Sequence, residues 1–197
     1  MKTEIEAKFL NIDQEKLRAR LKEIGAVMKY PERLMKRKVY DYPDARLKKI
    51  GAWIRVRDEG DGVITLSYKQ LLDRSLHGTK EITVEVNDFE TMCNFLQACG
   101  FDSKSYQETK REKWVLGESE ITIDTWPWIP TFAEVESGTE EEIHKVCDLL
   151  NLDWVKALHG SVETAYQDVF DVTEDDVNGW EEITFTPVPD WLEIRRK

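Results

Sequence analysis

Charged residues at alternate positions mark the segment Glu4-Ile5-Glu6-Ala7-Lys8. Side chains on a β-strand alternate between its two faces, so Glu4, Glu6 and Lys8 share one face while Ile5 and Ala7 share the other. Two carboxylates beside an ammonium group could bind a metal ion or an anion. On an ordinary antiparallel strand the same face would simply point into water. One strand does not decide between these interpretations.

The same alternation recurs in later strand-like segments. Its acidic members are Glu4, Glu6, Glu81, Glu85, Asp124, Glu134 and Glu136, and its basic members are Lys8, Lys36, Lys38, Arg55, Arg57, Lys69, Arg111 and Lys113. Carboxylates are the ligands that Mg²⁺ and Mn²⁺ prefer, and Arg and Lys side chains bind phosphate oxygens. If these faces converge, they suit a metal–polyphosphate complex.

Eight predicted strands would have to position these side chains. They cover residues 3–9, 34–42, 52–58, 63–70, 80–86, 108–116, 119–126 and 131–136, with predicted helices at about 14–25, 89–99, 140–150 and 162–170. An open sheet would leave the charged faces in water, whereas a closed barrel would turn them inward and pack its apolar face against outer helices. A charged lumen is costly unless it meets ions and ligands.

Length and composition limit the classes of protein. A chain of 197 residues can form one domain with a sizeable core. Its net charge of −11 argues against a nucleic-acid surface. No apolar run approaches the ~20 residues of a membrane span, and no signal peptide is visible. Three cysteines without metal-ligand spacing indicate free thiols. We therefore expect a cytoplasmic protein that binds neither nucleic acid nor membranes.

The order of the charged residues resembles the signature of the CYTH, or triphosphate tunnel metalloenzyme, family. That family includes class IV adenylyl cyclases, thiamine triphosphatases and inorganic triphosphatases. The resemblance covers residues 1–170 and rests on Glu4-x-Glu6-x-Lys8, a basic residue ahead of Tyr40-Asp41, Arg55-x-Arg57, Lys69, Glu81, Arg111, Asp124 and Phe132-Ala-Glu-x-Glu136. It implies an α+β fold, an eight-stranded antiparallel closed tunnel barrel with helices packed outside.

The chain departs from the family pattern in three places. Trp126-Pro-Trp-Ile-Pro130 stands where the family often has a Gly-rich link, and Thr109 stands where it has the Lys of Lys-x-Arg. Residues 171–197 have no counterpart in the family, so we expect a tunnel domain at 1–170 followed by a C-terminal appendage.

The resemblance also implies roles for individual residues. Ligands of Mg²⁺ or Mn²⁺ would be Glu4, Glu6, Asp124, Glu134 and Glu136, with Glu81 or Glu85 assisting. A triphosphate would be held by Lys8, Lys36, Arg55, Arg57, Lys69, Arg111 and Lys113, and the residues at the chemistry would be Glu4, Glu6, Lys8 and Glu81. Lys38 is expected nearer a rim, Lys156 could reach the tunnel mouth, and Trp53 could touch a ligand. The three histidines are expected to be non-catalytic.

Three functions follow as hypotheses. The first is a metal-dependent triphosphatase acting on an inorganic, nucleoside or thiamine triphosphate. The second is a class IV-type adenylyl cyclase, which would also need a base and a ribose pocket that the sequence does not reveal. The third is a polyphosphate- or nucleotide-binding module without turnover, which would not need so many carboxylates. In each case the expected partner is a small triphosphate. The sequence is compatible with either a monomer or a homodimer.

Overall fold

A ten-stranded sheet dominates the computed structural model, which describes residues 1–197. Its strands are β1 (Lys2–Glu4), β2 (Glu6–Phe9), β3 (Val27–Asp41), β4 (Ala52–Asp58), β5 (Ile64–Leu71), β6 (Thr79–Val86), β7 (Asp102–Leu116), β8 (Ser119–Thr125), β9 (Phe132–Glu136) and β10 (Glu182–Ile183). Nine of them follow the antiparallel order β1-β6-β5-β4-β3-β7-β8-β9-β2, and β10 pairs with β7 in parallel.

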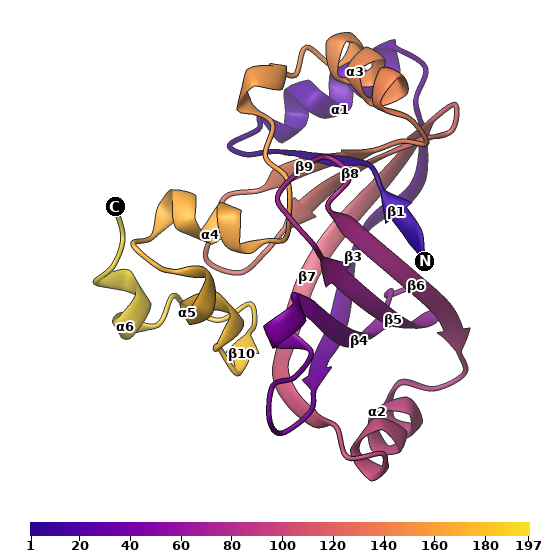
Figure 1. Cartoon of the computed structure of the whole chain (residues 1–197). Helices are drawn as coiled ribbons and strands as arrows, with labels where there is room; N and C mark the ends of the chain where they lie inside the picture. Colours follow the sequence, from indigo (N-terminus) through magenta and orange to yellow (C-terminus); the bar gives the residue numbers. More distant parts are fainter.

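The first two strands close this sheet into a barrel (Figure 1). They lie at opposite ends of the spatial order, yet only Ile5 separates them in the chain. Thus β1 pairs with β6, placing Glu4 opposite Thr79, while β2 pairs with β9, placing Glu6 opposite Glu136. The predicted antiparallel barrel is confirmed. Counted as one strand, β1 and β2 join β3–β9 to give the predicted eight, and β10 is an addition.

Two strands are much longer than predicted. Both β3 and β7 have 15 residues and pair with each other from Val27 opposite Val115 to Asp41 opposite Asp102. The register shifts around Tyr30 and again after Val39. The first irregularity lies next to Pro31, whose missing N–H cannot contribute to a regular ladder. This long ribbon extends well beyond the tunnel and reaches the segment where β10 pairs.

The apolar core lies outside the barrel, between the sheet and the helices. Helices α1 (Gln14–Glu23) and α3 (Glu140–Leu149) cover one patch together, where Leu21 and Ile143 pack with Ala7 and Val135 (Figure 1). Their N-termini are capped by Asp13 and Thr139. Helix α2 (Phe89–Ala98) covers a second patch, and none of the helices is long and apolar enough to cross a bilayer.

The C-terminal residues form part of a third apolar cluster. After α4 (Glu163–Val169), the chain continues through α5 (Glu174–Asn178), β10 and α6 (Asp190–Glu193). Ile183 and Leu192 are completely buried beside Trp126, Phe132 and Tyr166. Residues 171–197 therefore pack onto the barrel at the end where the Trp126–Pro130 link lies. Two short 3-10 helices, η1 (Lys48–Ile50) and η2 (Trp154–Lys156), complete the set of elements.

Candidate active site

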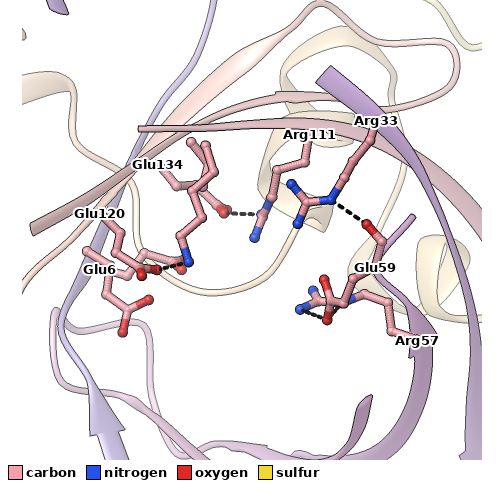
Figure 2. Close-up of a pocket in the computed structure, with 10 residues that line it drawn as sticks. Glu6, Arg33, Arg57, Glu59, Arg111, Glu120 and Glu134 are labelled. Atoms are coloured by element: carbon pink, nitrogen blue, oxygen red, sulfur yellow. Dashed lines mark hydrogen bonds and ion pairs between the residues drawn. The ribbon is translucent and has the colours of Figure 1, made fainter. Parts of the chain in front are cut away.

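The inner face of the barrel collects charged side chains from most of its strands. Residues opposite each other in an antiparallel pair point to the same side, and the registers place Arg37 opposite Arg57 and Arg111 opposite Asp124. A pocket inside the barrel has no hydrophobic lining residue. Its lining consists of Glu6, Arg33, Arg57, Glu59, Arg111, Lys113, Glu120, Thr122, Glu134 and Glu136 (Figure 2).

Acidic and basic side chains occupy opposite walls of this pocket. Figure 2 shows Glu6, Glu120 and Glu134 on one side and Arg33 and Arg57 on the other. Arg57 Nη2 lies 2.6 Å from Glu59 Oε1, and Arg33 Nε donates to the Glu59 carbonyl over 2.5 Å. Glu59 thus holds two arginines side by side. Their proximity favours a ligand with several negative charges.

Two arginines lie deeper than the pocket lining. Arg37 and Arg55 are both more than nine-tenths buried. Arg37 forms no ion pair; its Nη2 donates to Thr109 Oγ1 over 2.8 Å, and its guanidinium lies 4.6 Å from the Trp126 ring centre. Burial and the nearby charges of Arg55, Arg57 and Arg111 hold the pKa of Arg37 well below its ordinary range. Burial and Arg57 lower the pKa of Arg55 to about 10.

Several of these guanidinium groups lack hydrogen-bond acceptors. Arg33 Nη1, Arg37 Nε and Arg55 Nε are buried and have no partner. A buried donor without an acceptor is costly, and more so when it is charged. An anion inside the barrel would supply the missing acceptors. These three atoms are therefore direct structural support for an anion-binding lumen.

Arg111 lies between the acidic wall and the other arginines of the pocket (Figure 2). It donates to Asp124 Oδ1 over 2.6 Å and to Glu134 Oε2 over 2.8 Å. Burial opposes its charge, but Asp124 and Glu134 outweigh that effect and raise the pKa of Arg111. Asp124 is completely buried and also accepts a hydrogen bond from Thr122. Asp124 therefore orients Arg111 from below the pocket.

The acidic wall contains one carboxylate without a partner. Glu120 pairs with Lys113 at 2.6 Å, Glu134 with Arg111, and Glu136 with Lys2, whereas the Glu6 carboxyl group accepts no hydrogen bond and forms no ion pair. Burial and the charge of Glu134 raise the pKa of Glu6 to about 8. A cation beside Glu6 would favour its ionised form.

The donor chemistry of this wall fits a hard divalent cation. The lining contains carboxylate oxygens and neither His nor Cys. No three acidic, His or Cys side chains already form a metal cluster. Mg²⁺ commonly takes only one or two carboxylates and completes its shell with phosphate oxygens and water. Glu6, with Glu134 or Glu136, meets that smaller requirement.

A second acidic cluster lies on the β1, β5 and β6 side of the barrel. Lys69 Nζ is 3.0 Å from Glu4 and 3.8 Å from Glu81, which also pairs with Arg55 at 3.3 Å. Burial and a hydrogen bond with Glu81 raise the pKa of Glu4 to about 7, whereas the pKa of Glu81 is lowered despite its burial, first by Glu4. Of these two carboxyl groups, Glu4 is thus the one that takes up a proton more readily. The charges of Glu4 and Lys69 also act on Glu6.

The structure corrects the predicted inward position of Lys36. Lys36 is exposed on the outer face of β3, and Lys38 points to the same face, 3.7 Å from Glu90 of α2. Tyr40 shares their alternation and is completely buried beneath α2, which fixes this face outward. The inner positions of β3 are taken by Arg33 and Arg37. Glu85 and Lys156 are also exposed and do not line the pocket.

Other predicted residues lie at or near the lumen. Trp53 is half-buried opposite Lys69. Lys8 is buried behind the acidic wall, 3.4 Å from Glu134. None of the three histidines lines the pocket. Sequence reasoning missed Arg33, Arg37, Glu59 and Glu120, although Glu120 shares the alternation of Thr122 and Asp124 and could have been found by it.

Comparisons with known proteins agree with this architecture. A family model described as the CYTH domain matches residues 2–166. A proposed adenylate cyclase from Vibrio parahaemolyticus is 16% identical, with a TM-score of 0.73 over 84% of this chain and 98% of that one. A Pyrococcus horikoshii protein is 20% identical, with a TM-score of 0.66 over 78% and 93%.

A third related structure belongs to a protein that is described together with its activity. A proposed adenylyl cyclase from Hippeastrum, described as having a dominant triphosphatase activity, is 12% identical with a TM-score of 0.58 over 89% of this chain and 94% of that one. Among curated proteins, none matches the sequence. The structural likenesses establish the fold, and the family model spans nearly all of the barrel. The chain belongs to the CYTH family.

Proposed function

We propose that the protein is a metal-dependent triphosphatase that hydrolyses inorganic or organic triphosphates inside its barrel. The observation that carries this proposal is the set of buried arginine donors without acceptors, on Arg33, Arg37 and Arg55, in a barrel whose pocket also has a wall of carboxylates. Arginines on one side and metal-binding oxygens on the other are the two components that a phosphate chain with a divalent cation needs. The described activity of the Hippeastrum relative supports it.

The residues of the chain divide the work between binding and proton transfer. Arg37, Arg55, Arg57 and Arg111 would orient the phosphate chain and offset the charge that builds up on its oxygens. Glu6, with Glu134 or Glu136, would hold Mg²⁺ or Mn²⁺. When bound, that ion supplies charge neutralisation and a lower pKa for a coordinated water.

The second acidic cluster contains the groups best suited to proton transfer. The pKa of Glu4 is raised to about 7, and Glu4 and Glu81 both lie beside Lys69. A group whose pKa lies near the operating pH is suited to accept a proton from an attacking water. We assign this role to the Glu4–Glu81 pair, with Lys69 holding it in place.

The pocket favours hydrolysis over cyclisation. Pockets for aromatic groups are generally lined by apolar or aromatic surface, and no hydrophobic side chain lines this pocket. Among the candidate substrates, inorganic triphosphate therefore fits it best, and ATP, which cyclisation requires, fits it less well. The names of the related adenylate cyclases keep cyclisation as the second candidate. The unpartnered Glu6 argues against a binding module without turnover, because an anion alone gains nothing from an added carboxylate.

One assay separates the three functions. Purified protein is incubated with Mg²⁺ or Mn²⁺ and with inorganic triphosphate, thiamine triphosphate or ATP, and phosphate, pyrophosphate and cyclic AMP are measured. Released phosphate supports the proposal, cyclic AMP with pyrophosphate supports the cyclase, and tight binding without product supports the binding module.

Matched variants then test the site itself. Glu6→Gln and Glu136→Gln should abolish turnover while the circular dichroism spectrum stays native. Glu118→Gln changes an exposed carboxylate in the β7–β8 turn and should leave turnover intact. Full activity of Glu6→Gln would refute the proposed metal site.

A further inference from the structure

The ammonium group of Lys8 has no donor left for a phosphate. It donates to the carbonyls of Gly160 and Ser161, both over 2.9 Å, and lies 3.4 Å from Glu134 Oε1. A lysine ammonium has three N–H donors; two donate to these carbonyls, and the third is left to the ion pair with Glu134. The Lys8 side chain is 2% exposed, and the Phe132 ring centre lies 5.5 Å from its nitrogen. The group is thus enclosed by protein.

The carbonyls that bind Lys8 belong to a segment that finishes the closure of the barrel. We call residues 158–163 the seam segment. Its Leu158 exchanges two backbone hydrogen bonds of 2.9 Å with Lys8, on the edge of β2 that β9 does not occupy. His159 Nδ1 lies 3.1 Å from the Glu6 carbonyl on the same strand. The seam segment therefore continues the sheet beside the N-terminal strand.

The far side of the seam segment is fixed to the β5–β6 loop. Arg74 of that loop pairs with Glu163 at 3.1 Å, and Glu163 is completely buried and also accepts a hydrogen bond from Ser161. Gly160 has φ +95°, a conformation that favours glycine. That turn directs two successive carbonyls toward Lys8. Lys8 and Arg74 thus hold the seam segment from both sides.

We infer that Lys8 is a positioning residue that ties the seam segment to the acidic wall and does not bind the substrate. Through Glu134 it fixes a carboxylate that also pairs with Arg111 at 2.8 Å. The effect of this positioning role on catalysis rests on the proposed function, because Glu134 would hold the metal ion. The seam itself does not depend on that function. Loss of the Lys8 ammonium should loosen residues 158–163 and Glu134 together, with the arginine wall unchanged.

Lys8→Met tests this inference, since it keeps the length of the side chain and removes the ammonium. We expect amide hydrogen exchange in residues 158–163 to speed up at least tenfold. Affinity for inorganic triphosphate in EDTA, measured by calorimetry, should stay within twofold of wild type. The Mn²⁺ affinity and kcat should fall with little change in KM. Lys2→Met, which alters an exposed lysine on the same strand face, serves as the exchange control.

The opposite result would overturn the inference. If Lys8 bound phosphate, Lys8→Met would lower the affinity for inorganic triphosphate in EDTA at least tenfold and leave the exchange of residues 158–163 unchanged. Should Lys8→Met not fold, Glu163→Gln loosens the seam segment with Lys8 intact and is expected to give the same faster exchange with unchanged triphosphate affinity. Wild-type protein that neither binds nor cleaves triphosphate would refute the proposed function, while the exchange measurement would still decide the role of Lys8.

Discussion

Arg37→Met should weaken triphosphate binding without weakening the fold. Arg37 is buried, has no ion pair and stands among Arg55, Arg57 and Arg111. Without a ligand, the buried charge of Arg37 therefore destabilises the folded protein. It becomes stabilising only when an anion occupies the lumen. This substitution should therefore lower the affinity much more than the stability.

The structure sets the size of both effects. A hydrogen bond to a charged group contributes about 1.5–3 kcal/mol, so losing one should raise the Kd for inorganic triphosphate about 10–150-fold. Replacing a buried charge by an apolar side chain is neutral or stabilising by about 1–4 kcal/mol. The substitution also removes two stabilising interactions. These are the hydrogen bond to Thr109, which contributes about 0.5–1.5 kcal/mol, and the contact with the Trp126 ring, which contributes about 0.5–2 kcal/mol. Over their full ranges these terms run from a loss of about 3.5 to a gain of about 3 kcal/mol and nearly cancel at their centre, so we expect the free energy of unfolding to change little.

Urea denaturation and calorimetry measure the two quantities on the same preparations. Lys36→Met is the matched control, because Lys36 is the neighbouring basic residue on the outer face and should change neither. A loss of stability of about 4 kcal/mol or more, the size of a broken buried ion pair, would contradict the assignment of Arg37 as an unpaired charge. So would an unchanged Kd.

Three further predictions concern pH, the C-terminal residues and metal. Burial raises the pKa of Glu6 from 4.5 to about 8, so the folded protein retains a proton that the unfolded chain releases. The free energy of unfolding in EDTA should therefore fall as pH rises from about 5 to about 8, and fall less in Glu6→Gln; equal slopes in urea denaturation would contradict this. Leu192→Ala removes a completely buried side chain and should cost about 2–5 kcal/mol of stability, whereas an unaffected urea midpoint would show that residues 171–197 do not support the barrel. Mn²⁺ at about 100 times its Kd should stabilise the wild type by about 2.7 kcal/mol and Glu6→Gln by much less, and an equal rise in Tm would place the ion elsewhere.

Alternating patterns predicted the strands, and the family resemblance predicted their closure into a barrel, but neither gave the orientation of every strand. In Glu4-Ile5-Glu6-Ala7-Lys8 the charged and apolar residues separate cleanly, so the inner face is unambiguous. In β3 the basic residues Lys36, Arg37 and Lys38 are consecutive, and both faces carry charge. Only the burial of Tyr40 under α2, a contact between distant parts of the chain, decides the orientation.

The remaining differences have similar causes. Glu59 enters the site from the end of the β4–β5 hairpin, where no strand alternation applies, and it does so by holding Arg57. Residues 171–197 join the barrel through Ile183 and Leu192, which pack against aromatic residues from the Trp126–Pro130 link and α4. Such contacts depend on tertiary arrangement, and local sequence patterns carry no record of them.

The closure of the barrel has a consequence for its biosynthesis. Lys8 meets the carbonyl of Gly160, 152 residues further along the chain. During translation the first strand must therefore wait for nearly the whole barrel to leave the ribosome, and contacts of such long range form slowly. Until β9 and Leu158 are made, β2 has no partner strand and can join other chains. Substitutions that delay closure should thus reduce the yield of soluble protein in cells before they alter the activity of the molecules that do fold.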